Sequence, residues 1–186
     1  MVLLMGMSLD GFGADGWTPS NARPEDYGEM HDDVWRQLET VDTFVFGRVT
    51  FEVWQRAWPP LATDPKSSAF EQRFARYLDD IQKVVYARTL DAVSWRNARL
   101  VTGSIAEDVA RMKETAGRDI VIAGGSRIAA AFGELGLIDE YRLWVHPNIL
   151  GHGVPLLGKL TERKELKLLD ATTFRSGVVS LHLVPR

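Results

Sequence analysis

The sequence contains no cysteine, which excludes disulfide bonds, thiolate catalysis and cysteine-ligated zinc. It has only four histidines, and no two of them stand four residues apart, the spacing that places a zinc-binding pair on one face of a helix. From these two absences we predict that the protein has no metal site.

A strong charge of one sign is also absent. Lys and Arg number 22 against 25 Asp and Glu, so the formal net charge is −3, whereas nucleic-acid-binding surfaces are usually basic. No segment holds the roughly 20 uninterrupted apolar residues that a membrane helix needs, and the apolar run at residues 1–7 is too short for the core of a signal peptide. The sequence therefore predicts a cytoplasmic protein that binds neither nucleic acid nor membrane.

The composition is that of an ordinary globular chain. Its 186 residues, 45% hydrophobic and 25% charged, suit one compact domain over residues 1–186, and we find neither an internal repeat nor a linker. Short apolar segments bounded by turn residues predict strands at residues 2–7, 43–46, 83–86, 100–101, 119–123 and 140–145. Stretches between them predict helices at residues 25–39, 49–57, 67–78, 105–116 and 126–135.

The order of these segments predicts the fold class. Alternating strands and helices imply right-handed crossovers and a mostly parallel central sheet, an α/β fold. Two final apolar segments, 164–171 and 178–184, flank Arg175-Ser176-Gly177 and predict an antiparallel hairpin at one edge. Pro59 and Pro60 predict a loop after the second helix.

Three loops follow predicted strands, and in an open α/β sheet such loops form the ligand-binding edge. The first is Gly124-Gly125-Ser126-Arg127, where the glycines would let backbone N–H groups approach a phosphate and Ser126 could cap the next helix or bond a phosphate oxygen. This loop lacks the third glycine of a dinucleotide fingerprint and the Gly-Lys-Ser/Thr of a Walker loop. Taken alone, it fits a tight strand-to-helix turn equally well.

The second loop, Gly47-Arg48-Val49-Thr50, adds a guanidinium and a hydroxyl at another strand-to-helix junction. In the third, Arg88 and Thr89 could meet a further phosphate, such as the 2′-phosphate that distinguishes NADP from NAD. The alternative at both places is a plain turn with a solvated arginine. Two glycine-rich junctions in one domain indicate a diphosphate-bearing ligand more strongly than either junction does alone.

Candidates for the substrate side are fewer. Asp10, at the end of the first strand, could anchor a substrate, although an aspartate that stabilises its own turn is the more frequent case. The first predicted helix carries Glu29, His31, Asp32, Asp33 and Trp35, most of which fit a solvated helix face, and a proton donor could be among them. Asp10 and Asp32 are the candidate catalytic residues, with Glu29 a further candidate donor, and Trp35 and Trp54 could border a flat aromatic ligand. We interpret the segment at residues 146–153 as a structural crossover loop.

Taken together, these motifs resemble the dihydrofolate reductase superfamily, and most closely its branch of riboflavin-biosynthesis reductase domains. The resemblance covers nearly the whole chain in order. The segments that carry it are Met7-Ser8-Leu9-Asp10-Gly11, Gly47-Arg48-Val49-Thr50-Phe51-Glu52, Lys83-Val84-Val85-Tyr86-Ala87-Arg88-Thr89-Leu90, Gly124-Gly125-Ser126 and Leu137-Ile138-Asp139-Glu140-Tyr141.

The resemblance implies a dihydrofolate-reductase-like, three-layer α/β/α fold with a mixed sheet of about eight strands. It also implies NADPH as cofactor and a homodimer. The cofactor-binding residues that it implies are Gly47, Arg48 and Thr50 near the phosphates, Gly124, Gly125, Ser126, Arg127 and Ile128 around the diphosphate, and Arg88 near the 2′-phosphate.

Two departures from the family bear on the ligands. Ala87 stands where the family often has a serine that helps to hold the adenosine end, and Trp54 stands where the riboflavin reductases have a substrate-binding aspartate. From the motifs and the resemblance together, we predict an NADPH-dependent reductase of a small pterin-like or pyrimidine-like substrate. The alternatives are a true 5-amino-6-(5-phosphoribosylamino)uracil reductase of riboflavin biosynthesis and a dinucleotide-binding protein without turnover.

Overall fold

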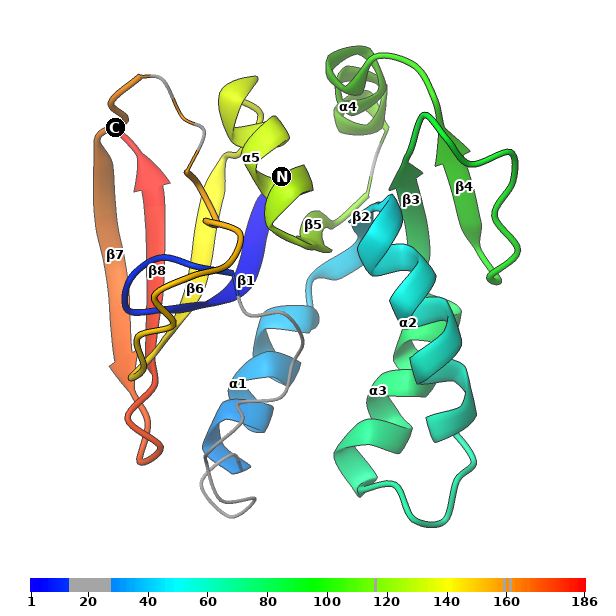
Figure 1. Ribbon diagram of the computed structural model, residues 1–186, viewed down its shortest axis with the longest axis horizontal. Helices are drawn as coiled ribbons and strands as arrows, with labels where there is room; N and C mark the ends of the chain where they lie inside the picture. The colour runs from blue at the N-terminus through cyan, green and yellow to red at the C-terminus, as the bar shows by residue number, and fades with distance from the viewer. Residues whose placement is uncertain (14–27, 116, 159, 161) are drawn as a thin grey trace.

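The computed structural model describes residues 1–13, 28–115, 117–158, 160 and 162–186 (Figure 1). Its strands are β1 (Val2–Ser8), β2 (Val41–Gly47), β3 (Gln82–Tyr86), β4 (Ala98–Val101), β5 (Asp119–Gly124), β6 (Glu140–His146), β7 (Leu166–Thr173) and β8 (Val179–Pro185). Its helices are α1 (Gly28–Leu38), α2 (Arg48–Leu61), α3 (Ala69–Asp80), α4 (Ile105–Glu114) and α5 (Ser126–Glu134).

All eight strands form one sheet in the order β4-β3-β2-β5-β1-β6-β8-β7. The six strands from β4 to β6 are parallel to one another, and β8 runs antiparallel to both β6 and β7. The turn between β7 and β8 contains Gly177, whose φ of 82° lies in the left-handed region that glycine adopts easily. The predicted mixed, mostly parallel sheet with a C-terminal antiparallel hairpin is confirmed.

Helices cover both faces of the sheet, which makes the predicted three layers. Neighbouring residues of a strand point to opposite faces, so Leu3 and Leu4 on β1 join different cores. The core that contains Leu4 is closed by apolar side chains of α1, α2 and α3, and the core that contains Leu3 by those of α4 and α5. The central strands are therefore apolar on both faces, as buried parallel strands usually are.

Two helix boundaries differ from the expectation. Helix α2 runs through Pro59 and Pro60, which were predicted to lie in a loop, and the N–H of Ala62 closes the helix on the carbonyls of both prolines. A proline near the end of a helix removes few backbone bonds, and the Trp58 ring packs against Phe74 of α3, so tertiary packing extends the helix. The predicted start of the first helix, residues 25–27, lies outside the described residues, which place α1 from Gly28.

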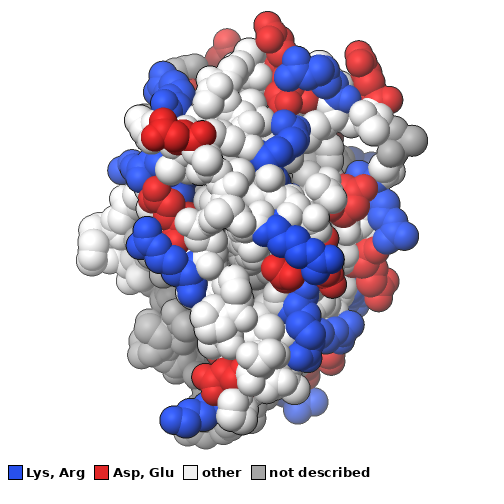
Figure 2. Space-filling view, turned by 90° about the vertical axis from the view of Figure 1, so that its right-hand side faces the viewer, with Lys and Arg blue, Asp and Glu red and all other residues white. Residues whose placement is uncertain are grey.

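The surface carries mixed charge. Figure 2, which looks at the side of the molecule that is on the right in Figure 1, shows basic and acidic side chains interspersed over that face. Within the described part of the chain, no helix is long and apolar enough to cross a bilayer.

Candidate functional site

The three phosphate-suited loops lie at one edge of the sheet. Strands β2 and β5 are parallel neighbours with Phe46 in register with Gly124, so the segments that follow them leave the sheet side by side. Strand β3 lies on the other side of β2, with Tyr86 in register with Gly47, and Arg88 follows it. The expectation that these loops share the carboxyl edge of the sheet is confirmed by the strand order.

Close packing requires glycine both at the end of β5 and at the N-cap of α5. A Cβ atom on Gly124 would lie 2.4 Å from the Cα of Phe46 and 2.7 Å from the carbonyl oxygen of Val45. Gly125 has a φ of 100°, and a Cβ there would lie 2.5 Å from the hydroxyl oxygen of Thr50. The two glycine-containing junctions are therefore in direct contact, and a side chain between them would push them apart.

The helices that begin at these junctions have open N-termini. The N-cap residues of α2 and α5 are Gly47 and Gly125, and neither provides a side-chain cap. The expectation that Ser126 caps α5 is wrong, because Ser126 is the first residue inside the helix; its hydroxyl lies against Gly13, where a Cβ would come within 1.9 Å of it. The first N–H groups of both helices remain available to an anion.

The other two helices whose N-caps are described have closed N-termini. Ser68 caps α3 in a reciprocal capping box with Glu71, and Ser104 accepts a hydrogen bond from the N–H of Glu107 at the start of α4. Both of these helices also carry acidic residues in the first turn, which favourably oppose the positive end of the helix dipole. Capping is therefore present at α3 and α4 and missing at α2 and α5, although α4 follows the parallel strand β4 and so begins at the same carboxyl edge as α2 and α5.

Arginines take the place of the acidic residues at the open helices. Arg48 is the first residue of α2 and Arg127 the second of α5, and both are exposed. The Arg48 Nη1 lies 2.9 Å from the Glu52 carboxylate one turn along α2, whereas Arg127 and the exposed Arg88 form no ion pair within the described ranges. A cation beside the positive end of a helix dipole is unfavourable by itself, so this arrangement favours a bound anion.

A buried carboxylate supports the β3 end of the edge. Asp108 accepts a hydrogen bond from the Tyr86 hydroxyl at 2.7 Å and two from the Arg99 guanidinium at 2.8 and 3.0 Å. Burial alone would raise the pKa of Asp108, but the hydrogen bonds from Arg99, Tyr86 and Arg111 outweigh it and lower the pKa. Asp108 thereby joins α4 to the last residue of β3, close to Arg88.

Asp10 connects two loops of the same edge. Its carboxylate accepts hydrogen bonds from the Ser8 hydroxyl at 2.6 Å and from the backbone N–H groups of Leu150 and Gly151, which follow β6. The Ser8 hydrogen bond is the main reason that the pKa of Asp10 is lowered. Asp10 thus stabilises turns, as the alternative interpretation held, but across two loops rather than within one.

The acidic residues of α1 take different positions. Asp32 is exposed, and Glu29 pairs with Arg175 at 2.9 Å. The buried acid is instead Asp33, which the sequence offered among the polar residues of this helix but did not single out: it accepts a hydrogen bond from the Trp144 indole N–H at 2.8 Å and pairs with Arg36. Its position three residues after the buried Met30, on the apolar face of the helix, was the available signal.

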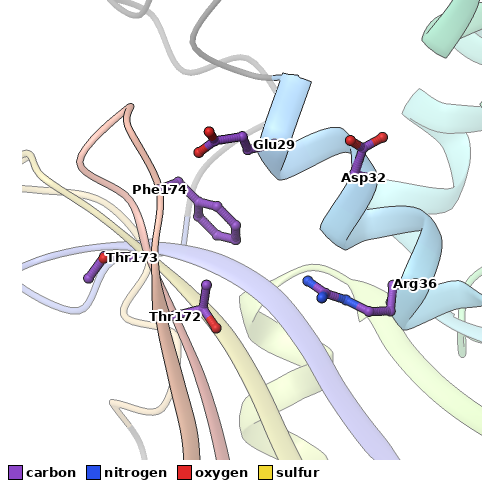
Figure 3. Close-up of a pocket in the computed structure, with 6 residues that line it drawn as sticks. All are labelled: Glu29, Asp32, Arg36, Thr172, Thr173 and Phe174. Carbon is purple, nitrogen blue, oxygen red and sulfur yellow. The ribbon is translucent and has the colours of Figure 1, made fainter.

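Glu29, Asp32 and Arg36 line one wall of an open groove of about 460 Å³, and the end of β7 forms the other (Figure 3). The ring of Phe174 points between the strand and the helix. Strands β7 and β6 are both antiparallel to β8, so the end of β7 lies at the same edge of the sheet as the loops above. The groove therefore lies at the carboxyl edge of the sheet, beside the outermost strand β7.

The two tryptophans predicted to contact substrate lie among aromatic side chains. Trp54 is 7% exposed, and its ring contacts those of Phe46, Trp58 and Phe74. Trp35 on α1 packs against the rings of three residues of α3, and the Arg73 guanidinium lies 3.8 Å from the centre of its ring. Most of both indole surfaces is used in packing, and a substrate contact from either one stays a prediction.

Similar proteins have been found at the levels of sequence and fold. The chain is 34% identical over 144 residues to the uncharacterised protein YyaP of Bacillus subtilis, covering 77% of this chain and 74% of YyaP. Its fold is similar to that of a pyrimidine reductase-like protein from Corynebacterium diphtheriae (TM-score 0.62, 16% identity, covering 100% of this chain and 91% of that one). It is also similar to dihydrofolate reductase from Enterococcus faecalis, solved with NADP(H) (TM-score 0.64, 12% identity, 100% and 95%).

The family comparison covers almost the whole sequence. Residues 1–180 match the family described as the RibD C-terminal domain, in agreement with the resemblance that the motifs indicated. This chain therefore belongs to the RibD C-terminal domain family and has the fold of dihydrofolate reductase.

Proposed function

We propose that residues 1–186 act as a single NADPH-dependent reductase domain that transfers hydride to a small, flat heterocycle of the pterin or pyrimidine kind. Membership of the RibD C-terminal domain family supports a reductase of this type. When bound, the nicotinamide supplies the hydride, and the residues of the chain bind and orient the reactants.

One observation carries the cofactor half of this proposal. Helices α2 and α5 begin side by side with glycine N-caps, without side-chain caps and without acidic residues in the first turn. Each has an arginine in that turn instead, Arg48 or Arg127. Backbone N–H groups and the positive ends of two helix dipoles thus lie side by side, and an arginine within reach of each helix start could add a guanidinium to a bound diphosphate.

The remaining cofactor residues are assigned from their positions. Thr50 lies against Gly125, so its hydroxyl is placed to donate to a phosphate oxygen at the contact between the two junctions. Ile128 packs beside Gly47, where it would form an apolar wall of the site. Arg88, exposed after β3, would pair with the 2′-phosphate and favour NADPH over NADH, even though Ala87 offers no hydroxyl.

The cofactor proposal is tested by titrating the protein with NADPH and following the fluorescence of its six tryptophans. We expect quenching that saturates, at least tenfold weaker binding after Arg48→Ala, and loss of the preference for NADPH over NADH after Arg88→Ala. Arg163→Ala is the matched control, because Arg163 is an exposed arginine paired with Glu165 just before β7. Absence of quenching at high micromolar NADPH would overturn the proposal.

Two alternative functions are separated by turnover assays. A 5-amino-6-(5-phosphoribosylamino)uracil reductase would oxidise NADPH with that substrate, and Trp54 in place of a hydrogen-bonding acid leads us to expect no such reaction. A dinucleotide-binding protein without turnover would bind NADPH but leave it unconsumed with every pterin, uracil or quinone-like acceptor.

We also propose a homodimer, as the family resemblance implies. The edge strand β7 leaves Leu168 and Leu169 about half exposed on its two faces, and an exposed edge strand is a surface on which another chain can pair. Sedimentation velocity tests this directly: we expect a species of twice the chain mass, and a monomer at all concentrations would contradict it.

A further inference from the structure

The sheet surface beside the proposed cofactor edge contains an opening over strand β1. Leu4 of β1 faces the core under α1, and Gly6, two residues later, faces the same way. Gly6 remains partly exposed, although β1 lies between β5 and β6 in the middle of the sheet. Because residue 6 is glycine, no side chain covers the backbone at this central position of the sheet.

The side chain beside this opening is the imidazole of His146, the last residue of β6. A Cβ atom on Gly6 would lie 3.1 Å from its Nε2 and 3.5 Å from its Cδ2. The register pairs Ser8 with His146 and Gly6 with Trp144, so the ring leans back across the sheet from its own position toward Gly6. The ring therefore borders the space above the Gly6 backbone.

His146 has hydrogen-bonding capacity that the fold does not use. Its residue surface is only 9% exposed, yet among the described residues neither ring nitrogen has a hydrogen-bond partner or an ion pair. Burial lowers the pKa of His146, so the ring is neutral at pH 7 and offers one N–H donor and one acceptor. The ring nitrogens are not fully enclosed, so this unused donor and acceptor remain open to a ligand.

The acidic groups of this region are already engaged. Both oxygens of Asp33 are used, one by Arg36 and the other by Trp144 and Ser180. Asp10 accepts three hydrogen bonds that hold its own turn and the loop after β6. His146, in contrast, keeps a hydrogen-bonding position that no described residue uses.

We propose that His146 is a substrate-binding residue: the flat heterocycle lies over the Gly6 backbone, and Nε2 of His146 makes a hydrogen bond with the polar edge of its ring. This inference rests on the proposed function and adds to it the residues that recognise the acceptor. Glycine at position 6 gives a planar ring close access to the sheet, and the imidazole sets its orientation by one directional bond. The segment that begins at residue 146, interpreted from sequence as a crossover loop, would then have a second role.

The test uses nuclear magnetic resonance of the four histidine rings in the full chain saturated with NADPH, with 7,8-dihydrobiopterin and 5-aminouracil as probes. Each ring signal is assigned from its own single-residue variant. We expect at least one probe to shift the His146 signals and move its titration midpoint, while the His182 signals stay in place. His182 is the internal control because it lies against the Glu140 carboxylate at the opposite end of β6.

Variants give a second readout. We expect His146→Leu to weaken binding of the probe about tenfold, since one hydrogen bond is lost, while NADPH affinity stays within twofold. His146→Gln should restore part of that binding, and Gly6→Ala should weaken it, because the new Cβ occupies the space beside Nε2. His182→Leu, the same change on β8, should alter neither affinity. Thermal melts of each variant show whether it remains folded.

The outcomes separate the two proposals. If NADPH binds and neither probe shifts the His146 signals, or if His146→Leu binds the shifting probe as tightly as the wild type, the inference about His146 is overturned and the cofactor proposal stands. If NADPH does not bind, the proposed function fails, and probe-induced shifts of His146 measured without cofactor would still support a binding site over Gly6.

Discussion

The helices of this protein begin in two contrasting ways. Helices α3 and α4 start with Ser68 and Ser104 as caps and with acidic residues in the first turn, so each stabilises its own N-terminus. Helices α2 and α5 start with glycines and continue with arginines. The first pair can be understood from folding stability alone, whereas the second pair gives up local stability at the place where a phosphate group would restore it.

This difference separates the helix starts that are stabilised by their own side chains from those that we propose to bind the cofactor. Both kinds follow strands or loops and bury an apolar face against the sheet, so burial does not separate them. Capping does separate the two kinds. An N–H group without a partner at a helix start destabilises the free protein, and the same group can donate a hydrogen bond to an anion. Four substitutions test this difference between the helix starts.

The largest effect is expected for Gly124→Ala. Its Cβ would lie 2.4 Å from the Cα of Phe46, a backbone atom that cannot move without separating β2 from β5, and we expect a loss of about 3 kcal/mol in the free energy of unfolding. Urea denaturation measures it. Gly103→Ala is the control before the capped helix α4, where a Cβ would meet nothing within 4 Å; its stability should stay within about 1 kcal/mol of the wild type. Equal stability of the two variants would contradict the close approach.

The second prediction reverses a charge. Arg127→Glu puts a carboxylate into the first turn of α5, so the free protein should gain about 0.3–1 kcal/mol of stability at low salt. NADPH binding should weaken at least thirtyfold, about 2 kcal/mol, because an attraction to the diphosphate becomes a repulsion. Fluorescence titration and urea melts measure the two quantities. The opposite change on α4, Glu107→Arg, should lower stability slightly and leave NADPH affinity unchanged; a similar loss of affinity in both variants would indicate a general charge effect.

The third prediction converts an open helix start into a capped one. Gly47 has a φ of −83°, and a Cβ there would lie 3.5 Å from Ile128, an ordinary contact, so Gly47→Ser is sterically allowed. The new hydroxyl should cap α2 and raise stability by a few tenths of a kcal/mol, while it competes with the ligand and weakens NADPH binding about tenfold. Ser104→Gly, the reverse change on α4, should cost stability without creating NADPH affinity. Unchanged binding by Gly47→Ser would remove α2 from the cofactor site.

The last prediction concerns how stability changes with pH at the acidic first turn of α4. Because the folded protein lowers the pKa of Asp108 below its usual 3.8, the unfolded chain takes up the proton first as the solution becomes acidic. The stability that Asp108 contributes is present above pH 3.8 and is lost as the pH falls through the lowered pKa. The difference in unfolding free energy between wild type and Asp108→Asn should therefore narrow in acid. A constant difference from pH 7 to pH 3 would contradict this assignment.

Sequence reasoning performed best where a signal is local. The glycines after β2 and β5 and the turn at Gly177 need only their neighbours to be understood, and the structure confirms these turns. It was less successful where contacts with residues far away in the sequence determine a helix boundary or the burial of a side chain. Pro59 and Pro60 are compatible with the end of α2 because Trp58 packs on α3, and Asp33 rather than Asp32 is the buried acid of α1 because Trp144 of β6 provides its partner.

The sequence by itself determined the alternation of strands and helices, the α/β class, and the junctions suited to phosphate, because these depend on residues close together in the chain. The packing of the whole chain placed β2 beside β5 and so brought the two glycine motifs into contact. It also placed His146 over Gly6 and left its imidazole without a partner among the described residues. The physical reason is that these strand pairings join residues far apart in the chain, from 77 positions for Phe44 and Val121 to 138 for Val2 and Glu140, and they depend on the packing of the whole chain.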